Sequence, residues 1–334
     1  MKRTVFVAAL AATVAQLCLA QTPTSPVTTP GVTTWKLATG YRAESFHTQN
    51  IDAFAMEVAQ ATKGQLKIEV SPNNSLVKLA EIPTAVATGK VQAGEAIMSG
   101  MGKAVPLAGA DGVPFVVFNY ADVQRLWTLQ RPGIEREFAE LGLKPLYAVP
   151  WPPQGLYTTK PIKDTNDLNG LKMRTYNPTT VRIAQLLGAT PVDVTMPQVG
   201  QALAEGKLDA MITSAVTGVE NRVWTGLKYY YELNAWFPKN IVFVNAKAFA
   251  ALPAATQQAV LSAAAKAETR GFALSQAAAS SATEELRKNG MKVEPVPFEL
   301  GRDLKRMGEK FSREWVTSVG NSANEIFIPY YALR

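Results

Sequence analysis

The chain alternates strand-like and helix-like segments twice over, and this alternation restricts the fold more than any other feature of the sequence. In the first half, strand patterns at residues 35–39, 66–70 and 91–98 are separated by helical patterns at 46–63 and 79–88. Strands that alternate with helices in this way indicate an α/β protein built around mostly parallel sheets.

The second half repeats this order. The expected strands and helices are strands 157–159, 171–175, 190–194 and 208–213, and helices 180–187 and 197–205. The segment Ala85–Ala93 matches Ala202–Ala210 at five of nine positions, and each reads as a helix end, a glycine and a strand. We therefore expect two α/β lobes whose strand-end loops, Ser99–Met101 and Thr213–Ala215, face each other across a cleft.

Two segments could carry the chain between the lobes. Tyr147–Pro153 is extended and rich in proline, and Lys239–Asn245 reads as a strand. Residues 254–288 predict a helix about 50 Å long, which would run along both lobes. Gly271 is its only expected break, so two helices kinked there are an equal alternative. A strand at 291–296 and an amphipathic helix at 300–318 follow.

The first twenty residues read as a secretory signal peptide. Lys2 and Arg3 precede an uncharged run from Val5 to Ala20 that ends in a small residue suited to cleavage. The run is shorter than the roughly 20 apolar residues of a membrane span. We therefore expect a periplasmic protein, with residues 21–33 as a Thr/Pro-rich, flexible lead-in.

Cysteine and charge exclude several functional classes. Cys18 is the only cysteine and would leave with the signal peptide, which excludes disulfides, a thiol nucleophile and a cysteine metal site. Removal of Lys2 and Arg3 lowers the formal net charge from +7 to +5. The remaining basic residues are scattered, so no nucleic-acid surface is expected.

Catalysis and cofactor binding are not expected either. The chain has one histidine, no Gly-x-Ser-x-Gly elbow, and no third glycine after Gly100-Met101-Gly102 to complete a dinucleotide loop. Clusters with metal-ligand spacing are also missing from the sequence, although a Ca²⁺ held by carboxylates or a metal that bridges the ligand stays open. The expectation is a binding protein and not an enzyme.

The strongest site signal is the segment Asp167–Thr180, DLNGLKMRTYNPTT. It reads as a turn at Gly170, a short strand and a helix capped by Thr179 or Thr180. Arg174 then lies where a strand ends and a helix begins, which is where ligands bind in open α/β sheets. A guanidinium beside the first N–H groups of a helix suits an anion, so we expect Arg174 to bind a carboxylate.

Other candidates lie at strand ends, loops and crossings. The expected ligand contacts besides Arg174 are Asn177, Thr213, Ser214, Lys78, Asn240, Trp151, Trp236 and Tyr157. Trp151 and Trp236 occupy the two expected hinge crossings and could form an apolar wall opposite Arg174. Glu44 and His47 lie in the first strand-end loop, and His47 is expected to be a helix cap or a core contact.

From Trp35 onward the chain resembles a solute-binding protein of a TRAP (tripartite ATP-independent periplasmic) transporter, the family often called C4-dicarboxylate-binding. The resemblance depends on five segments in order, which are Phe54–Leu76, Ala87–Ala96, Asp167–Thr180, Ala202–Met211 and Ile241–Pro253. It implies a two-lobed periplasmic binding protein of the type II-like class, with hinge strands and one long helix across both lobes. It also implies partners, namely a carboxylate ligand and a permease of a small and a large membrane subunit.

The resemblance implies roles for single residues as well. In the family the arginine of the LKxR strand pairs with the ligand carboxylate, and the asparagine three residues later lies nearby; these are Arg174 and Asn177. A second arginine often stands in the strand before, where this chain has Gln154, which is the tenth expected ligand contact. One strong cation for one carboxylate favours a monocarboxylate, with a leaning toward an aromatic or apolar acid such as an aryl 2-oxo acid.

The expected lobes are residues 34–150 with 239–270, and residues 151–238 with 271–334. Two alternatives stay open: a binding component of another importer or of a sensor, and specificity for a sugar acid or a dicarboxylate.

Overall fold

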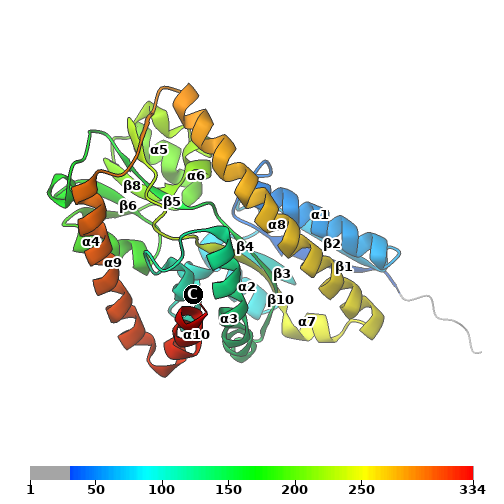
Figure 1. Cartoon of the computed structure of the whole chain (residues 1–334). Helices are drawn as coiled ribbons and strands as arrows, with labels where there is room; N and C mark the ends of the chain where they lie inside the picture. The colour runs from blue at the N-terminus through cyan, green and yellow to red at the C-terminus, as the bar shows by residue number, and fades with distance from the viewer. Residues whose placement is uncertain (1–30, 334) are drawn as a thin grey trace, which may run out of the picture. The chain divides into compact units, whose positions relative to one another are not determined.

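The structure is a computed structural model that describes residues 31–333. The expected signal peptide, residues 1–20, lies outside this range, as does the expected lead-in up to residue 30. The described residues form two mixed sheets with helices around them, which confirms the α/β class (Figure 1). Sequence predicted the positions of most strands to within a few residues.

The first sheet has the strand order β2-β1-β3-β10-β4. Its strands are β1 (Thr33–Ala38), β2 (Leu66–Ser71), β3 (Ala93–Ile97), β4 (Leu143–Pro150) and β10 (Lys239–Asn245). Strand β1 pairs in parallel with β2 and β3, whereas β10 runs antiparallel to β3 and β4. The sheet is therefore mixed, whereas a mostly parallel sheet was expected. Its antiparallel strand is β10, the segment that returns from the second sheet.

The second sheet has the order β11-β9-β5-β8-β6-β7. Its strands are β5 (Gln154–Thr158), β6 (Lys172–Thr175), β7 (Thr190–Asp193), β8 (Ala210–Ser214), β9 (Tyr229–Tyr231) and β11 (Lys292–Glu294). Strand β6 is parallel to β7 and β8, while β5 is antiparallel to β8 and β9. The carboxyl ends of β6, β7 and β8 thus lie at one edge, where Arg174 was expected to bind its ligand.

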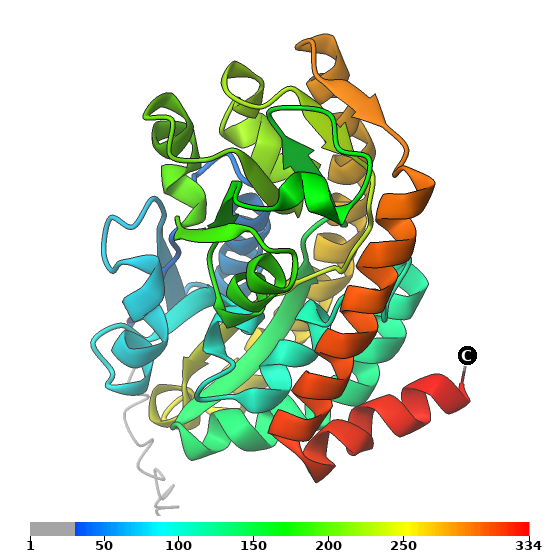
Figure 2. The ribbon, with the colours of Figure 1, turned by 90° about the vertical axis from the view of Figure 1, so that its left-hand side faces the viewer.

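The α-helices are α1 (Phe46–Ala61), α2 (Ile82–Ala87), α3 (Tyr120–Glu140), α4 (Pro178–Leu186), α5 (Val199–Ala204), α6 (Ala215–Glu220), α7 (Ala246–Ala250), α8 (Ala254–Lys288), α9 (Phe298–Val319) and α10 (Asn321–Ala332). Short 3-10 helices are η1 (Leu79–Glu81), η2 (Met98–Met101), η3 (Pro106–Gly112), η4 (Thr165–Leu168), η5 (Met196–Gln198) and η6 (Val223–Thr225). Sequence did not predict α3 or α10, which pack against each other (Figure 2).

The two matching segments of the sequence form the same local structure. Helix α2 is followed by Gly89 and β3, and α5 is followed by Gly206 and β8. Both glycines have positive φ angles, 77° and 65°, which a side chain would disfavour. The expected duplication of a helix–glycine–strand unit is therefore present in the backbone.

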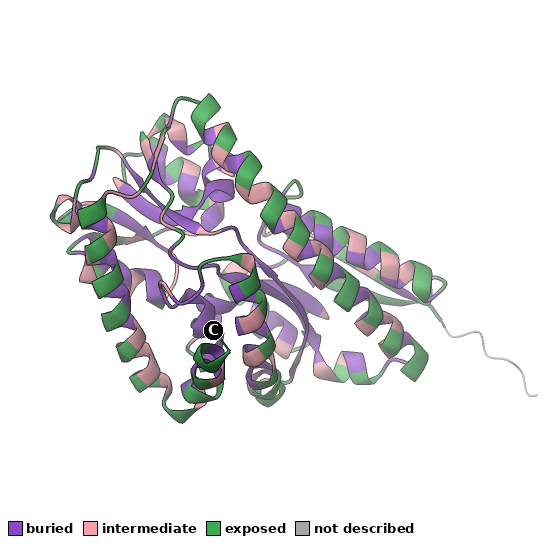
Figure 3. Cartoon of the chain, in the orientation of Figure 1, coloured by how far each residue is buried: buried purple, intermediate pink, exposed green. Residues whose placement is uncertain are grey.

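Two buried clusters of side chains hold the described chain together, and both include strands of each sheet. Side chains alternate between the clusters along a strand, as Leu156 and Tyr157 do in β5 and Ile212 and Met211 do in β8. This is the period of two that a strand buried on both faces requires. Figure 3 shows the strands as mostly buried and the outward faces of the helices as exposed.

The chain passes between the sheets at two short crossings that lie side by side. Residues 151–153 join β4 to β5, and residues 232–238 join β9 to β10. The backbone N–H of Trp151 donates to the Pro238 carbonyl at 2.8 Å, and that of Gln154 donates to the Trp236 carbonyl at 3.0 Å. The two crossings are thus held together by backbone hydrogen bonds. The exact limits of the two lobes stay a prediction.

Helix α8 is a single helix of 35 residues, so the alternative of two helices that separate at Gly271 is wrong. It packs against α1 and β4 on one side of the crossings and against α6 and β11 on the other (Figure 1). Gly271 lies where α8 meets β4, and a Cβ atom there would overlap the side chain of Val149. The glycine permits close packing of the helix and does not break it.

Contacts between α6 and the loop after β1 bring a carboxyl group into a buried position. The Arg42 guanidinium donates to the Glu220 backbone carbonyl at 2.7 Å. Burial is the main cause that raises the pKa of Glu220 to about 7, and the nearby Arg42 only partly opposes it.

We expect Gly271→Ala to lower the melting temperature by several degrees, because overpacking against Val149 costs about 1–3 kcal/mol. Gly301→Ala in α9 is the matched control, since its Cβ would have only an ordinary contact with Val296 and alanine favours a helix by about 1 kcal/mol. Thermal unfolding followed by circular dichroism measures both. Equal stabilisation of the two variants would contradict the close packing at Gly271.

We also expect the stability difference between the wild type and Glu220→Gln to depend on pH. A carboxyl pKa raised from 4.5 to about 7 holds a proton in the folded state that the unfolded chain releases. The wild type therefore loses stability relative to the variant as pH rises from about 5 to 8, by on the order of 2 kcal/mol. Melting curves across this range test it, with the exposed Glu284→Gln as control. Parallel curves for wild type and Glu220→Gln would contradict the raised pKa.

Candidate ligand-binding site

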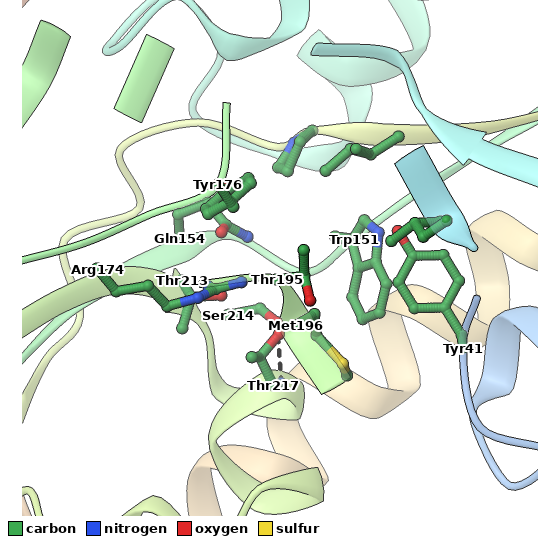
Figure 4. Close-up of a pocket in the computed structure, with 13 residues that line it drawn as sticks. Tyr41, Trp151, Gln154, Arg174, Tyr176, Thr195, Met196, Thr213, Ser214 and Thr217 are labelled. Carbon is green, nitrogen blue, oxygen red and sulfur yellow. Dashed lines mark hydrogen bonds between the residues drawn. The ribbon is translucent and has the colours of Figure 1, made fainter. Parts of the chain in front are cut away.

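A pocket with an empty volume of about 490 Å³ lies between the two sheets, where strands of both end (Figure 4). This volume includes space that opens to solvent. The residues that line it are Tyr41, Leu79, Ile97, Trp151, Gln154, Arg174, Tyr176, Thr195, Met196, Thr213, Ser214, Thr217 and Pro238. Five of the ten residues expected from the sequence are among them: Arg174, Gln154, Thr213, Ser214 and Trp151.

Among residues 31–333, Arg174 is the only cationic residue that lines the pocket, and it is only 3% exposed. Its Nε donates a hydrogen bond to the Val194 carbonyl at 2.9 Å, and its guanidinium carbon lies 4.6 Å from the centre of the Tyr176 ring. Within residues 31–333, no Asp or Glu forms an ion pair with it. Burial lowers the pKa of Arg174 to about 10, so the side chain still carries its charge at neutral pH.

A buried cation without a counter-ion is unfavourable, because desolvation is not offset by an ion pair. The two Nη nitrogens of Arg174 make no hydrogen bond to any described residue, while Nε is already bound to Val194. A carboxylate could accept hydrogen bonds from these donors and supply the missing negative charge. The pocket is thus chemically suited to an anion at this end.

Tyr176 follows Arg174 by two residues and forms the surface under its guanidinium. Burial raises the pKa of Tyr176 to about 12, although the positive charge of Arg174 opposes this shift. The indole N–H of Trp236 approaches the Tyr176 hydroxyl as a hydrogen-bond donor. Trp236 itself does not line the pocket, so it supports Tyr176 from behind.

The opposite wall is formed by Tyr41 and Trp151, and Asn240 lies behind both. The Asn240 side-chain carbonyl accepts from the Trp151 indole N–H at 2.9 Å and from the Tyr41 hydroxyl at 3.3 Å, and its amide N donates to Glu95 at 2.9 Å. Asn240 therefore fixes the wall and does not itself reach the pocket. His47 Nδ1 lies 3.4 Å from Glu95 Oε1, and the centre of its ring lies 4.2 Å from that of Trp151. His47 is therefore a core contact, and its burial lowers the pKa of its imidazole.

Strand β8 and helix α6 supply hydroxyl groups. The Ser214 hydroxyl caps α6 by accepting from the Thr217 backbone N–H at 3.2 Å. The Thr213 hydroxyl makes no hydrogen bond to another described residue and is free for a ligand. Gln154, at the start of β5, donates to the Pro152 carbonyl at 2.8 Å, which leaves its side-chain oxygen available as an acceptor.

Three more expected contacts lie outside the pocket lining, as Trp236 and Asn240 do, and the roles of all five stay predictions. Asn177 is the N-cap of α4, accepts from the Thr180 N–H at 2.9 Å, and donates to the Ser99 hydroxyl at 2.7 Å. This cap was expected at Thr179 or Thr180, which is wrong because the asparagine side chain forms a capping box one turn earlier. Tyr157 donates to the Ser214 carbonyl at 3.0 Å from within the core, and Lys78 is exposed.

Sequence reasoning missed eight residues of the pocket, and five of them follow strands within three residues. These are Tyr41 after β1, Tyr176 after β6, Thr195 and Met196 after β7, Thr217 in α6, and Leu79, Ile97 and Pro238. The same strand-end reasoning that identified Arg174 applies to Tyr41, Tyr176 and Met196. It was not applied to them because no charge or motif marks these positions.

None of the helices in residues 31–333 has the length and apolar character to span a membrane. No group of three or more His, Cys, Asp or Glu residues that could hold a metal ion occurs in the same range.

The crystal structure of DctP7, a Bordetella pertussis extracytoplasmic solute receptor that binds pyroglutamic acid, is similar to this chain. It is 38% identical, has a TM-score of 0.88, and the match covers 90% of this chain and all of that one. A TRAP solute-binding protein from a marine metagenome, specific for pyroglutamate and crystallised with it, is 36% identical with a TM-score of 0.89, over 90% of this chain and 99% of that one.

Curated relatives give a weaker match. A protein of Albidiferax ferrireducens named "Solute-binding protein" is 26% identical over 181 residues, or 53% of each chain. This chain thus aligns with about half the length of the first curated relatives it matches.

The expected resemblance to TRAP solute-binding proteins is confirmed by these structures and by a family match that spans residues 37–315, most of the chain. The two-lobed fold of that class accounts for the two sheets, the paired crossings and the pocket between them. This chain belongs to the bacterial extracellular solute-binding protein family 7.

Proposed function

We propose that this chain is the extracytoplasmic receptor of a TRAP transporter, which captures pyroglutamate or a closely similar cyclic monocarboxylate and delivers it to a membrane permease. The relatives that are 36–38% identical over nearly the whole chain are described as receptors for pyroglutamate, which supports this ligand class. The proposal assigns no catalysis to the chain. It includes export to the periplasm, removal of the predicted signal peptide, and a permease of a small and a large subunit as partner.

The observation that carries the proposal is the buried, unneutralised guanidinium of Arg174. A ligand carboxylate would remove the cost of that charge and form charge-assisted hydrogen bonds with it. In a pocket closed to water the attraction is stronger than at an exposed site, since the local dielectric constant is lower. The anion of the ligand is therefore assigned to this end of the pocket.

The rest of the pocket favours a compact body with one negative charge. Apolar surface comes from Leu79, Ile97, Trp151, Met196 and Pro238. No second Lys or Arg lines the pocket, so a second carboxylate would lack a cation there. This argument keeps the expectation of a monocarboxylate with an apolar body, and it favours a small ring over a dicarboxylate or a polyhydroxylated sugar acid.

Capture would proceed by closure of the lobes about the paired crossings. Residues from both sheets and from both crossings line the pocket, so an open form would separate its walls and admit the ligand. The closed form buries the ligand and differs in surface shape from the open form. A permease could therefore distinguish the ligand-bound receptor from the empty one.

We expect Arg174→Gln to weaken pyroglutamate binding by about 100-fold or more. Two charge-assisted hydrogen bonds at about 1.5–3 kcal/mol each would be lost. Calorimetric titration of protein that has been unfolded, dialysed and refolded to remove co-purified ligand measures the affinity. Arg182→Gln is the matched control, because Arg182 is an exposed arginine that pairs with Glu314 outside this pocket and should leave affinity unchanged.

Two results would contradict the proposal. Pyroglutamate binding by Arg174→Gln with the affinity of the wild type would remove Arg174 from the site. A wild-type protein that ignores pyroglutamate but binds a dicarboxylate or a uronate would assign the receptor to another ligand class.

A further inference from the structure

Two hydrogen bonds join the halves of the protein beside the pocket, and none of the four residues that form them lines it. One links Ser99 in η2 to Asn177 at the start of α4, and the other links Arg42, after β1, to Glu220 at the end of α6. Strand β1 and η2, which follows β3, belong with the first sheet, while α4 and α6 follow β6 and β8 of the second. Each contact therefore spans a gap that widens if the halves part.

The contact between Ser99 and Asn177 lies at the Arg174 end of the pocket. Asn177 follows the lining residue Tyr176, whose ring centre is 4.6 Å from the guanidinium carbon of Arg174. The Asn177 side-chain oxygen accepts from the Thr180 N–H at 2.9 Å, and its nitrogen donates to the Ser99 hydroxyl at 2.7 Å. Ser99 is only 4% exposed. This contact ties the helix that follows Arg174 to the half with the first sheet.

The contact between Arg42 and Glu220 lies at the other end, on the side where Figure 4 shows Tyr41. Tyr41 lines the pocket and directly precedes Arg42, while Thr217 lines it about one helical turn before Glu220. Nη1 of Arg42 donates to the backbone carbonyl of Glu220 at 2.7 Å. The last carbonyls of a helix have no partner within the helix, so a donor from the other half satisfies one of them here.

These two contacts differ from the other connections between the halves. The crossings are continuous chain and stay joined when the halves part, and helices α8, α9 and α10 contribute no residue to the pocket lining. The two side-chain contacts, in contrast, must break on opening, so they favour the closed form. A ligand that binds the closed form gains affinity from any interaction that favours this form, even one that it does not touch.

We propose that Arg42 and Ser99 are positioning residues that hold the two halves closed over the ligand and lengthen its residence time without touching it. This inference rests on the proposed function, since it takes capture to proceed by closure. The contacts form after the ligand has entered the open cleft. They therefore slow dissociation and leave association almost unchanged, as is usual when affinity changes within one binding site.

The test uses one variant for each contact. Ser99→Ala removes the acceptor hydroxyl and leaves the cap of α4 intact, because Asn177 is unchanged. It should weaken pyroglutamate binding by about three- to tenfold. Arg42→Met removes the donor and keeps an unbranched side chain, and it should weaken binding by about two- to fivefold, since water competes for an exposed donor. The double variant should lose about the product of the two factors, because the contacts lie at separate ends of the pocket.

The rates of binding and release distinguish positioning from a general loss of structure. Stopped-flow tryptophan fluorescence of the refolded mature chain, to which Trp151 in the pocket wall contributes, measures both rates. The loss of affinity should come from faster dissociation. The melting temperature of the ligand-free variants should stay at that of the wild type, because the open form lacks both contacts, while the rise in melting temperature on addition of pyroglutamate should shrink.

Arg222→Met is the matched control for Arg42→Met. Arg222 is an exposed arginine two residues after Glu220, and within residues 31–333 its side chain forms no hydrogen bond or ion pair. Its loss removes the same charge near the same end of the pocket. An effect of charge alone on an anionic ligand would therefore appear in both variants, whereas we expect wild-type rates for Arg222→Met.

The outcomes separate this inference from the proposed function. Wild-type dissociation rates in both Ser99→Ala and Arg42→Met overturn the positioning role and leave pyroglutamate capture standing. An equal change in Arg222→Met, or a loss of affinity that comes from slower association alone, does the same. Failure of the wild type to bind pyroglutamate overturns the proposed function and this inference with it.

Discussion

The structure depends on a positive charge that the protein buries and leaves without a partner. Arg174 is held by one hydrogen bond to the Val194 carbonyl and by the ring of Tyr176, and neither neutralises it. An unpaired ion in a low-dielectric region is costly, which is why we propose that a ligand anion completes the site. The second sheet supplies the cation, while the first sheet and the crossings supply most of the apolar wall. Neither half lines the pocket alone, so the proposed binding would depend on how the halves meet.

Much of the fold was predictable because its signals are local. Period-two strands, helices that end at glycine and the long alanine-rich helix α8 all follow from short-range patterns. Of the four α-helices that were not predicted, the two longest each contain an internal proline, Pro132 in α3 and Pro329 in α10, which interrupts the helical signal. The antiparallel return of β10 could not be deduced either, since strand direction in a sheet is set by contacts between distant segments.

The candidate site likewise combines residues that local sequence signals identify with residues that only contacts between distant segments bring into place. Arg174 was identifiable because charge, strand end and following helix coincide in one segment, and Trp151 because it lies in a proline-rich crossing. Tyr157 and Trp236 carry local signals as strong as that of Trp151, but neither lines the pocket. Tyr157 lies in the core and Trp236 lies behind Tyr176. The sequence alone does not show which face of a segment will meet the cavity. Asn240 likewise binds Trp151 and Tyr41 and does not line the pocket, and its role toward a ligand stays a prediction. Such indirect roles arise from tertiary contacts and leave no local pattern.

The long helix α8 has a further consequence, which comes from the small residues on its buried face. Where it crosses from one half to the other, that face consists of Ala263, Ala264, Ala267, Gly271 and Ser275. A surface with so little relief lets the helix lie close to its neighbours, as at Val149, where no room is left for a Cβ atom on Gly271. If the halves part as proposed, the contacts of one continuous helix with both of them therefore restrict the directions in which they can move.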